Sequence, residues 1–136
     1  MGLHVYDARL WLPGPPSPVN ATQPAPPLAL ELQYARALSG QRIAERSLDE
    51  MRRQGALSSE VAHAWLAHMR AVFPDVVAGD RLCGVQRSDG ATLFLHNDNA
   101  KGDVTDPAFG ARFFGIWLSA QTSQPGLRRQ LLGLPA

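Results

Sequence analysis

The sequence predicts an α+β fold, and three patterns in the chain support that prediction. Residues 28–34 alternate between large apolar side chains and polar or small ones, which is typical of a strand with one covered face. Two strand-like runs, 81–87 and 91–97, flank a serine, aspartate and glycine at 88–90, and this arrangement predicts a β-hairpin. Longer stretches carry apolar residues at helical spacing, so helices accompany the strands.

The composition fits one domain that spans residues 1–136. Apolar residues make up 45% of the 136 residues, which is enough for one core. The formal net charge of +1 gives no reason to expect binding to nucleic acid. No apolar run approaches the roughly 20 residues of a membrane-spanning helix. No leader is visible, and the chain begins as if a strand were already under way, so we expect that an upstream segment has been removed.

Two further strands and two loops are predicted. Residues 3–12 mix aromatic and β-branched residues with polar ones, and 100–104 form a shorter strand-like run. Seven prolines between 13 and 27 predict an extended surface loop, and the glycosylation sequon at Asn20 within it is given almost no weight. The polar run 96–99 follows a strand, and we interpret it as a turn.

Four helices are predicted. The first covers about 40–54 after a Ser39 cap, and the second begins after Ser58 or Ser59 and ends at 73. The third covers 107–118, and the last begins near residue 125. The residues expected to face inward are Ala44, Leu48 and Met51 on the first; Val61, Trp65, Met69 and Val72 on the second; Phe109, Phe113, Ile116 and Trp117 on the third; and Leu127 and Leu131 on the last, with Arg128 and Arg129 outward.

The sequence contains no self-contained catalytic motif. It has no nucleophile elbow, no phosphate-binding P-loop and no dinucleotide-binding glycine motif. His63 and His68 are five positions apart and do not share a helix face, so we expect no metal and no cofactor. Cys83 is the single cysteine, and we interpret it as a small core residue of a strand rather than a nucleophile.

Three stretches of the chain resemble one family. They are GLHVYDARLW at 2–11, YARALSGQRIAERS at 34–47 and FFGIWLS at 113–119. They look like the bacterial chalcone-isomerase-like domain, which is similar to plant chalcone isomerases and to plastid fatty-acid-binding proteins. The resemblance implies an open-faced β-sandwich, an antiparallel sheet covered by helices, lacking here its N-terminal strand. It also implies a bacterial, periplasmic protein.

The same resemblance identifies where the family's catalytic residues fall in this chain. The family's arginine belongs to a strand upstream of this sequence, and its threonine falls at about Met1. Its tyrosine falls at Ile43, its asparagine at Glu50 and its late hydroxyl residue at about Gly110. Isoleucine and glycine have no side-chain donor, and a glutamate does not replace the amide, so we expect no chalcone isomerase activity.

The function expected from the resemblance is non-catalytic binding of a fatty acid or another apolar small molecule. Arg36 is the first candidate anchor for a carboxylate and Arg42 the second. The alternatives are a structural or partner-binding domain, with an exposed sheet face or edge, and an isomerase or intramolecular lyase acting on an unknown substrate. In the structural alternative Arg36 points to solvent and the phenylalanines are plain core. The candidate ligand-binding residues are Tyr34, Arg36, Arg42, Ile43, Phe109 and Phe113.

Overall fold

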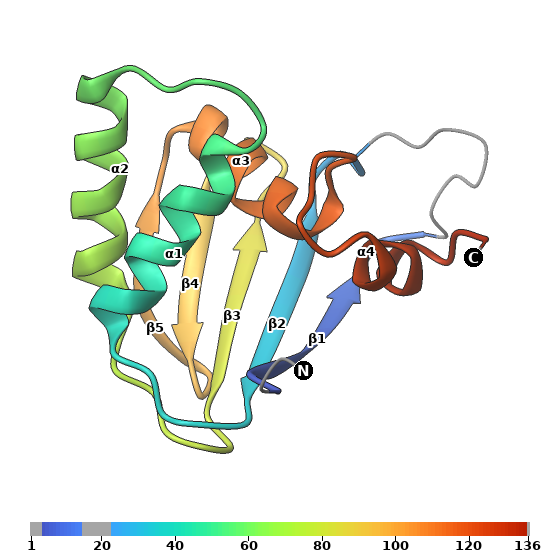
Figure 1. The fold of residues 1–136 in the computed structure, drawn as a ribbon, viewed down its shortest axis with the longest axis horizontal. Coiled ribbons are helices and arrows are strands. Elements are labelled where there is room, and N and C mark those ends of the chain that lie inside the picture. Colours follow the sequence, from blue (N-terminus) through green and yellow to red (C-terminus); the bar gives the residue numbers. More distant parts are fainter. Residues whose placement is uncertain (1–3, 15–22, 136) are drawn as a thin grey trace.

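A computed structural model describes residues 4–14 and 23–135, and it contains one antiparallel sheet with helices packed on one face (Figure 1). The five strands lie in chain order across the sheet. They are β1 (Tyr6–Trp11), β2 (Leu28–Tyr34), β3 (Arg81–Gln86), β4 (Thr92–His96) and β5 (Asn99–Val104). The helices are α1 (Gly40–Arg52), α2 (Ser59–Val72), α3 (Pro107–Leu118) and α4 (Pro125–Leu132). The predicted strands and helices are confirmed within a few residues, whereas the Asn20 sequon lies outside the described residues.

The alternation in β2 separates the two faces of the sheet. Leu28, Leu30, Leu32 and Tyr34 are buried beneath the helices, and the residues between them lie on the opposite, outer face. β2 pairs with β1 on one side and β3 on the other, with Leu32 opposite both Ala8 and Leu82. A slip of one residue would turn this leucine row outward, so burial fixes the register.

Short turns connect β3, β4 and β5 into a meander. Asn97 and Asp98, the two residues between β4 and β5, have φ angles of 47° and 71°, the left-handed region that asparagine and aspartate tolerate. The predicted turn at 96–99 is therefore confirmed. The hairpin turn between β3 and β4 is closed by the Asp89 carboxylate, which accepts a hydrogen bond from the Ala91 amide at 2.9 Å.

α3 is buried along most of its length. Its aromatic residues pack on the sheet, and Trp117, 4% exposed, donates from Nε1 to the Tyr6 hydroxyl at 2.8 Å. The carbonyls near its end are also satisfied: Thr122 Oγ1 donates to the Ile116 carbonyl at 2.6 Å, and Arg128 Nε donates to the Leu118 carbonyl at 2.9 Å. The prediction that this helix is deeply buried is confirmed.

Three side chains differ from their predicted positions. Arg128 is 9% exposed rather than outward, because its guanidinium reaches the end of α3. Val61 is 37% exposed, and Ala62 takes its place on the buried stripe of α2, since both positions fit helical spacing with Trp65. Cys83 is half-buried on the outer face of β3 rather than in the core. Burial raises the pKa of its thiol to about 11, so the thiol is protonated at neutral pH.

The length and composition of the helices decide whether any of them could cross a membrane. In the ranges 4–14 and 23–135, the structure contains no helix that is both long enough and apolar enough to cross a bilayer. The helices pack instead against each other and the sheet, with α2 beside β5 and α4 beside β1.

The burial of Trp117 leads to a stability prediction. We expect Trp117→Ala to lower the free energy of unfolding by about 3–5 kcal/mol, because it leaves a cavity and removes the partner of Tyr6. Val61→Ala is the control, and it should change stability by less than about 0.5 kcal/mol because the Val61 side chain is partly exposed. Urea unfolding followed by circular dichroism measures both, and equal midpoints for Trp117→Ala and the native chain would contradict the prediction.

Candidate functional site

Two of the candidate residues, Phe109 and Phe113, belong to an aromatic cluster between α3 and the sheet. Their rings stack with centroids 5.7 Å apart, and Phe113 meets the ring of Phe94 edge-on at 5.0 Å. Phe73, from the end of α2, meets Phe94 in the same way at 5.0 Å. Phe109 is 0% exposed and Phe113 5%. These two phenylalanines therefore fill the interior and do not line an open cleft.

Tyr34 lies at the end of β2 and is also buried. Its ring meets the ring of Tyr6 edge-on, with centroids 5.7 Å apart, and Tyr6 in turn accepts the hydrogen bond from Trp117. Among the described residues no hydrogen bond to the Tyr34 hydroxyl is found. Burial raises the pKa of this hydroxyl well above its ordinary value of 10.0, and the group stays neutral. Within residues 4–14 and 23–135, the Tyr34 hydroxyl therefore has no side chain or carbonyl that accepts its hydrogen bond.

The segment 34–42, which we call the β2–α1 junction, is held by the loop at 73–80. Leu38 and Val76 exchange backbone hydrogen bonds of 3.0 and 2.9 Å, and the Gly40 amide donates to the Asp75 carboxylate at 2.8 Å. A Cβ on Gly40 would collide with the Phe73 carbonyl, so only glycine allows this approach. The junction is consequently a fixed segment of backbone.

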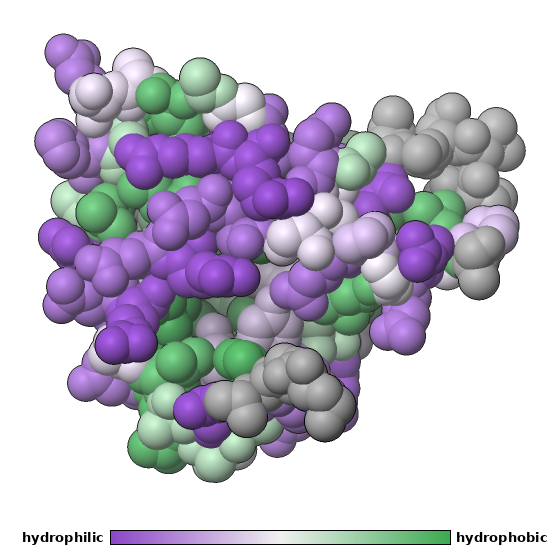
Figure 2. All heavy atoms as spheres, in the orientation of Figure 1, coloured by the Kyte–Doolittle hydropathy of each residue, from purple (hydrophilic) through white to green (hydrophobic). Residues whose placement is uncertain are grey.

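Arg36 and Arg42 extend from this junction to solvent. Both are exposed, and in the described part of the chain neither guanidinium makes an ion pair or a hydrogen bond. Val77, in the neighbouring loop, is 60% exposed. Figure 2 shows hydrophilic side chains over α1 and apolar surface below them, toward the loops that join β2 to α1 and α2 to β3. Two cations without an ion-pair partner among the described residues thus extend from a junction whose neighbouring loop carries the exposed Val77.

The positions of the family's catalytic groups are occupied by residues with other roles. Ile43 is 8% exposed and packs in the core. Glu50 accepts a hydrogen bond from Ser123 Oγ at 2.7 Å and lies 3.5 Å from the Arg46 guanidinium. Met1 lies outside the described residues. None of the described positions therefore presents a free donor of the kind that the family's chemistry uses.

Gly110 brings α3 close to two polar side chains that sequence reasoning missed. Gln86 and Thr92 occupy inward positions on β3 and β4 and are 4% and 0% exposed. A Cβ on Gly110 would lie 2.5 Å from Gln86 Nε2 and 2.9 Å from Thr92 Oγ1, so a larger residue does not fit. Thr92 Oγ1 is buried without a hydrogen-bond partner among the described residues. Polar residues at inward positions of two predicted strands are the signal that could have found this pair.

A hollow of about 340 Å³, lined by both polar and apolar atoms, lies away from the candidate residues. Gln54, Arg112 and Gln121 are among its lining residues, and none of the six candidates belongs to that lining. Arg112 Nη1 donates to the carbonyls of Met51 at 3.1 Å and Gly55 at 2.7 Å, where it satisfies the end of α1. The Arg112 guanidinium is therefore already bound to backbone carbonyls of its own chain.

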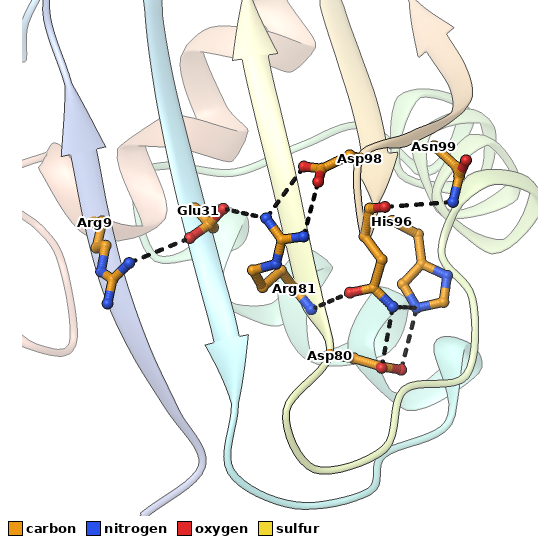
Figure 3. Close-up of polar contacts among 8 residues, drawn as sticks. Arg9, Glu31, Asp80, Arg81, His96, Asp98 and Asn99 are labelled. Carbon is orange, nitrogen blue, oxygen red and sulfur yellow. Dashed lines mark hydrogen bonds and ion pairs between the residues drawn. The ribbon is translucent and has the colours of Figure 1, made fainter.

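The outer face of the sheet carries a chain of ion pairs (Figure 3). Glu31 lies 3.9 Å from the guanidinium of Arg9 and 3.5 Å from that of Arg81. Arg81 also binds both carboxylate oxygens of Asp98, at 3.1 and 2.9 Å, and this contact holds the pKa of Asp98 below its ordinary value. The charges satisfy one another, so this network does not present an unpaired group to a ligand.

A second cluster lies at the end of the sheet, where Asp80 precedes β3 and His96 ends β4. Asp80 receives hydrogen bonds from the Val77 amide at 3.0 Å and from Asn97 Nδ2 at 3.1 Å, and it lies 3.1 Å from His96 Nε2. The Val77 amide is the largest cause of the lowered pKa of Asp80, followed by Asn97 and His96. In the described ranges no three histidine, cysteine, aspartate or glutamate side chains gather as metal ligands would.

The comparison with protein families shows to which family the chain belongs. A family model described as chalcone isomerase-like matches residues 1–133. The chain belongs to this family. The resemblance predicted from three stretches of sequence is thereby confirmed, and it extends over nearly the whole chain. No curated protein matches this chalcone isomerase-like chain.

A solved structure shares the fold of the chalcone isomerase-like chain. It is the crystal structure of a fatty-acid binding protein from Arabidopsis thaliana, with a TM-score of 0.60 and 10% sequence identity. The match covers 77% of this chain and 54% of the plant protein, so this chain spans about half the length of that protein. At such low identity the likeness shows the fold, and it confirms the predicted antiparallel sheet covered by helices.

The candidate residues of the chalcone isomerase-like chain fall into two groups. Phe109, Phe113 and Ile43 lie in the core, and Tyr34 is linked to Phe113 through Tyr6 and Trp117, whose ring lies 5.3 Å from that of Phe113. Arg36 and Arg42 lie at the surface of the β2–α1 junction. The first group packs together in the core, whereas Arg36 and Arg42 are exposed.

The unpartnered hydroxyl of Thr92 generates a prediction with a matched control. We expect Thr92→Val to leave stability unchanged or to raise it by up to about 1–3 kcal/mol, because it removes a buried polar atom that lacks a partner. Thr122→Val should instead lower stability by about 1 kcal/mol, since the buried Thr122 hydroxyl donates to the Ile116 carbonyl. Thermal unfolding of both variants measures the difference, and a similar loss in both would show that Thr92 has a partner in solution.

Proposed function

We propose that this chalcone isomerase-like chain is a non-catalytic domain that binds a fatty acid or another apolar small molecule carrying a carboxylate. The observation that carries the proposal is the pair of guanidinium groups of Arg36 and Arg42, which are exposed at the β2–α1 junction and make no ion pair among the described residues, while the neighbouring loop carries the exposed Val77. A guanidinium can bind a carboxylate with two parallel hydrogen bonds, and an acyl chain needs apolar surface close to its headgroup. The fatty-acid binding function of the plant protein with the same fold supports this choice of ligand.

The backbone of the junction favours binding at this place. The hydrogen bonds from Leu38 and Gly40 to the loop at 73–80 hold the segment before any ligand arrives. Less conformational entropy is therefore lost on binding than at a mobile loop. The hydroxyl of Tyr34, two residues before Arg36, has no hydrogen-bond partner among the described residues although most of the side chain is buried, and it is a further donor available to a polar ligand group.

The absence of catalysis is the second part of the proposal. A positioned donor or proton-transfer group contributes about 10²- to 10⁴-fold to a rate, and the positions that match the family's groups hold Ile43, Glu50 and Gly110. The Glu50 carboxylate already interacts with Ser123 and Arg46. From the family resemblance alone we also propose a bacterial, periplasmic location, which fractionation of the source cells followed by immunoblotting would test.

The anchor is tested by titrating a fluorescent fatty acid into the native protein and into single variants. We expect Arg36→Met to weaken binding by roughly 10- to 150-fold, because a charge-assisted hydrogen bond contributes about 1.5–3 kcal/mol. Arg42→Met should weaken it by a smaller factor. Methionine retains much of the apolar stem, so the variants isolate the charge.

Arg53→Met is the matched control for this titration. Arg53 is exposed at the other end of α1, so the variant makes the same change in net charge away from the junction. It should bind as the native protein does. Equal affinities for all four proteins would show that neither arginine is the anchor, and no binding to the native protein would contradict the ligand-binding function itself.

The catalytic part is tested with a chalcone. We expect no acceleration of ring closure above the rate in buffer, because the described residues place no donor at the positions of Ile43 and Gly110. Absorbance of the chalcone follows the reaction, with a plant chalcone isomerase as the positive control and chiral chromatography of the product. Formation of one enantiomer in excess would overturn the non-catalytic assignment.

A further inference from the structure

The hollow of about 340 Å³ contains a guanidinium whose hydrogen-bonding groups are only partly used. Its volume falls within the range of about 300–1,000 Å³ that small-molecule sites occupy. Arg112 belongs to the lining, and the carbonyls of Met51 and Gly55 both accept hydrogen bonds from Nη1 of this side chain. Within residues 4–14 and 23–135, the Nε and Nη2 groups of Arg112 have no acceptor, and no carboxylate pairs with them. One edge of the guanidinium is therefore available to a ligand.

The available edge has a fixed position. The two hydrogen bonds from Nη1 hold the guanidinium at the end of α1, so little side-chain freedom is lost when a ligand binds. Gly55 lies beside this edge with a φ angle of 139°, in the region that favours glycine, and a Cβ there would lie 3.3 Å from Nη2. Glycine thus leaves Nη2 uncovered at this position. The Nε and Nη2 hydrogens together match the two oxygens of a carboxylate.

Two glutamine side chains bring neutral hydrogen-bonding groups to the same hollow. Gln54 Nε2 donates to the Arg112 carbonyl at 2.7 Å, which leaves Gln54 Oε1 without a donor among the described residues. Gln121 Oε1 accepts from Ser119 Oγ at 2.8 Å, which leaves Gln121 Nε2 without an acceptor in the same part of the chain. One spare acceptor and one spare amide donor therefore accompany the guanidinium. The rest of the lining consists of Gln23, Ala111 and Ala120.

The charges around the hollow favour a singly charged ligand. Glu50, on the last turn of α1, has its carboxylate already in contact with Ser123 Oγ at 2.7 Å and with the Arg46 guanidinium at 3.5 Å. Two carbonyls from the end of α1 lie against Arg112, and carbonyls at this end of a helix carry partial negative charge. They weaken the attraction of the guanidinium for an anion. A carboxylate is therefore favoured over a doubly charged phosphate.

We propose that this hollow is a second binding site of the chain, which takes a small molecule with one carboxylate and an adjacent amide. The carboxylate binds Nε and Nη2 of Arg112, the ligand N–H donates to Gln54 Oε1, and the ligand carbonyl accepts from Gln121 Nε2. None of the residues proposed to bind a fatty acid belongs to the lining, so this site does not depend on that function.

Titration with N-acetylglycine tests the site, because this molecule carries the three groups and no long acyl chain. We expect saturable changes, at millimolar concentrations, in the nuclear magnetic resonance signals of the Gln54, Gly55 and Gln121 backbone amides and of Arg112 Nε in the isotope-labelled full chain. N-acetylglycinamide has nearly the same shape without the charge and should bind at least about tenfold more weakly. Inorganic phosphate at matched ionic strength should also bind more weakly. No saturable change with N-acetylglycine, or equal affinity for either of the other probes, would overturn the proposal.

Two variants test the roles of the lining residues. Arg112→Lys keeps the charge but loses the paired hydrogens, so N-acetylglycine should bind at least about tenfold more weakly. Arg129→Lys, an exposed position on α4 outside the lining, is the matched control and should bind as the native chain does. Gln121→Leu changes an exposed side chain, so its folding is not at risk, and it should weaken binding by about 2- to 10-fold. Native affinity in Gln121→Leu or in a folded Arg112→Lys, or a loss in Arg129→Lys, would contradict the assigned contacts.

Discussion

The packing of α3 against the inner face of the sheet is the interaction on which the rest of the structure depends. This helix has buried residues on nearly every side, so each neighbour must exclude water from it. Gly84 on β3 and Gly110 on α3 let helix and strands approach closely, and the aromatic rings fill the space that remains. The side chains of Gln54, Thr122 and Arg128 satisfy its carbonyls from three different segments. The placement of α1 and α4 follows from these contacts.

The filled interior beneath α3 limits where the proposed ligand could bind. Stacked rings of Phe109 and Phe113 leave no space for an acyl chain beneath α3 without rearrangement of the core, which costs free energy because interiors are close-packed. The rim of the sheet has no such constraint. At the β2–α1 junction backbone hydrogen bonds hold the segment to the loop at 73–80, whereas the side chains of Arg36 and Arg42 are exposed and make no ion pair within the described residues. Hydrogen-bonded backbone at Leu38 and Gly40 and exposed charged side chains at Arg36 and Arg42 thus lie in the same short segment.

Local patterns were sufficient to predict the elements but not all side-chain environments. The alternation in β2 and the caps Ser39 and Ser58 are signals carried by a few adjacent residues, and the structure contains each of them. The environment of Arg128 depends on where another helix ends, which the sequence of α4 does not specify. The candidate site was predicted as a set of residues on adjacent elements, but whether Phe113 lines a cleft or fills a core depends on packing, because both environments use the same residue types.

Gly40 has a consequence for how the family can diverge. Its missing side chain lets the start of α1 lie against the carbonyl of Phe73, which caps the end of α2, so the two helix ends and the loop that follows α2 are held together. A homologue with any larger residue at this position would have to separate these ends. The segment that carries Arg36 and Arg42 would then lie at a different distance from the loop that follows α2. The identity of this one residue therefore sets how closely the two helix ends can approach each other.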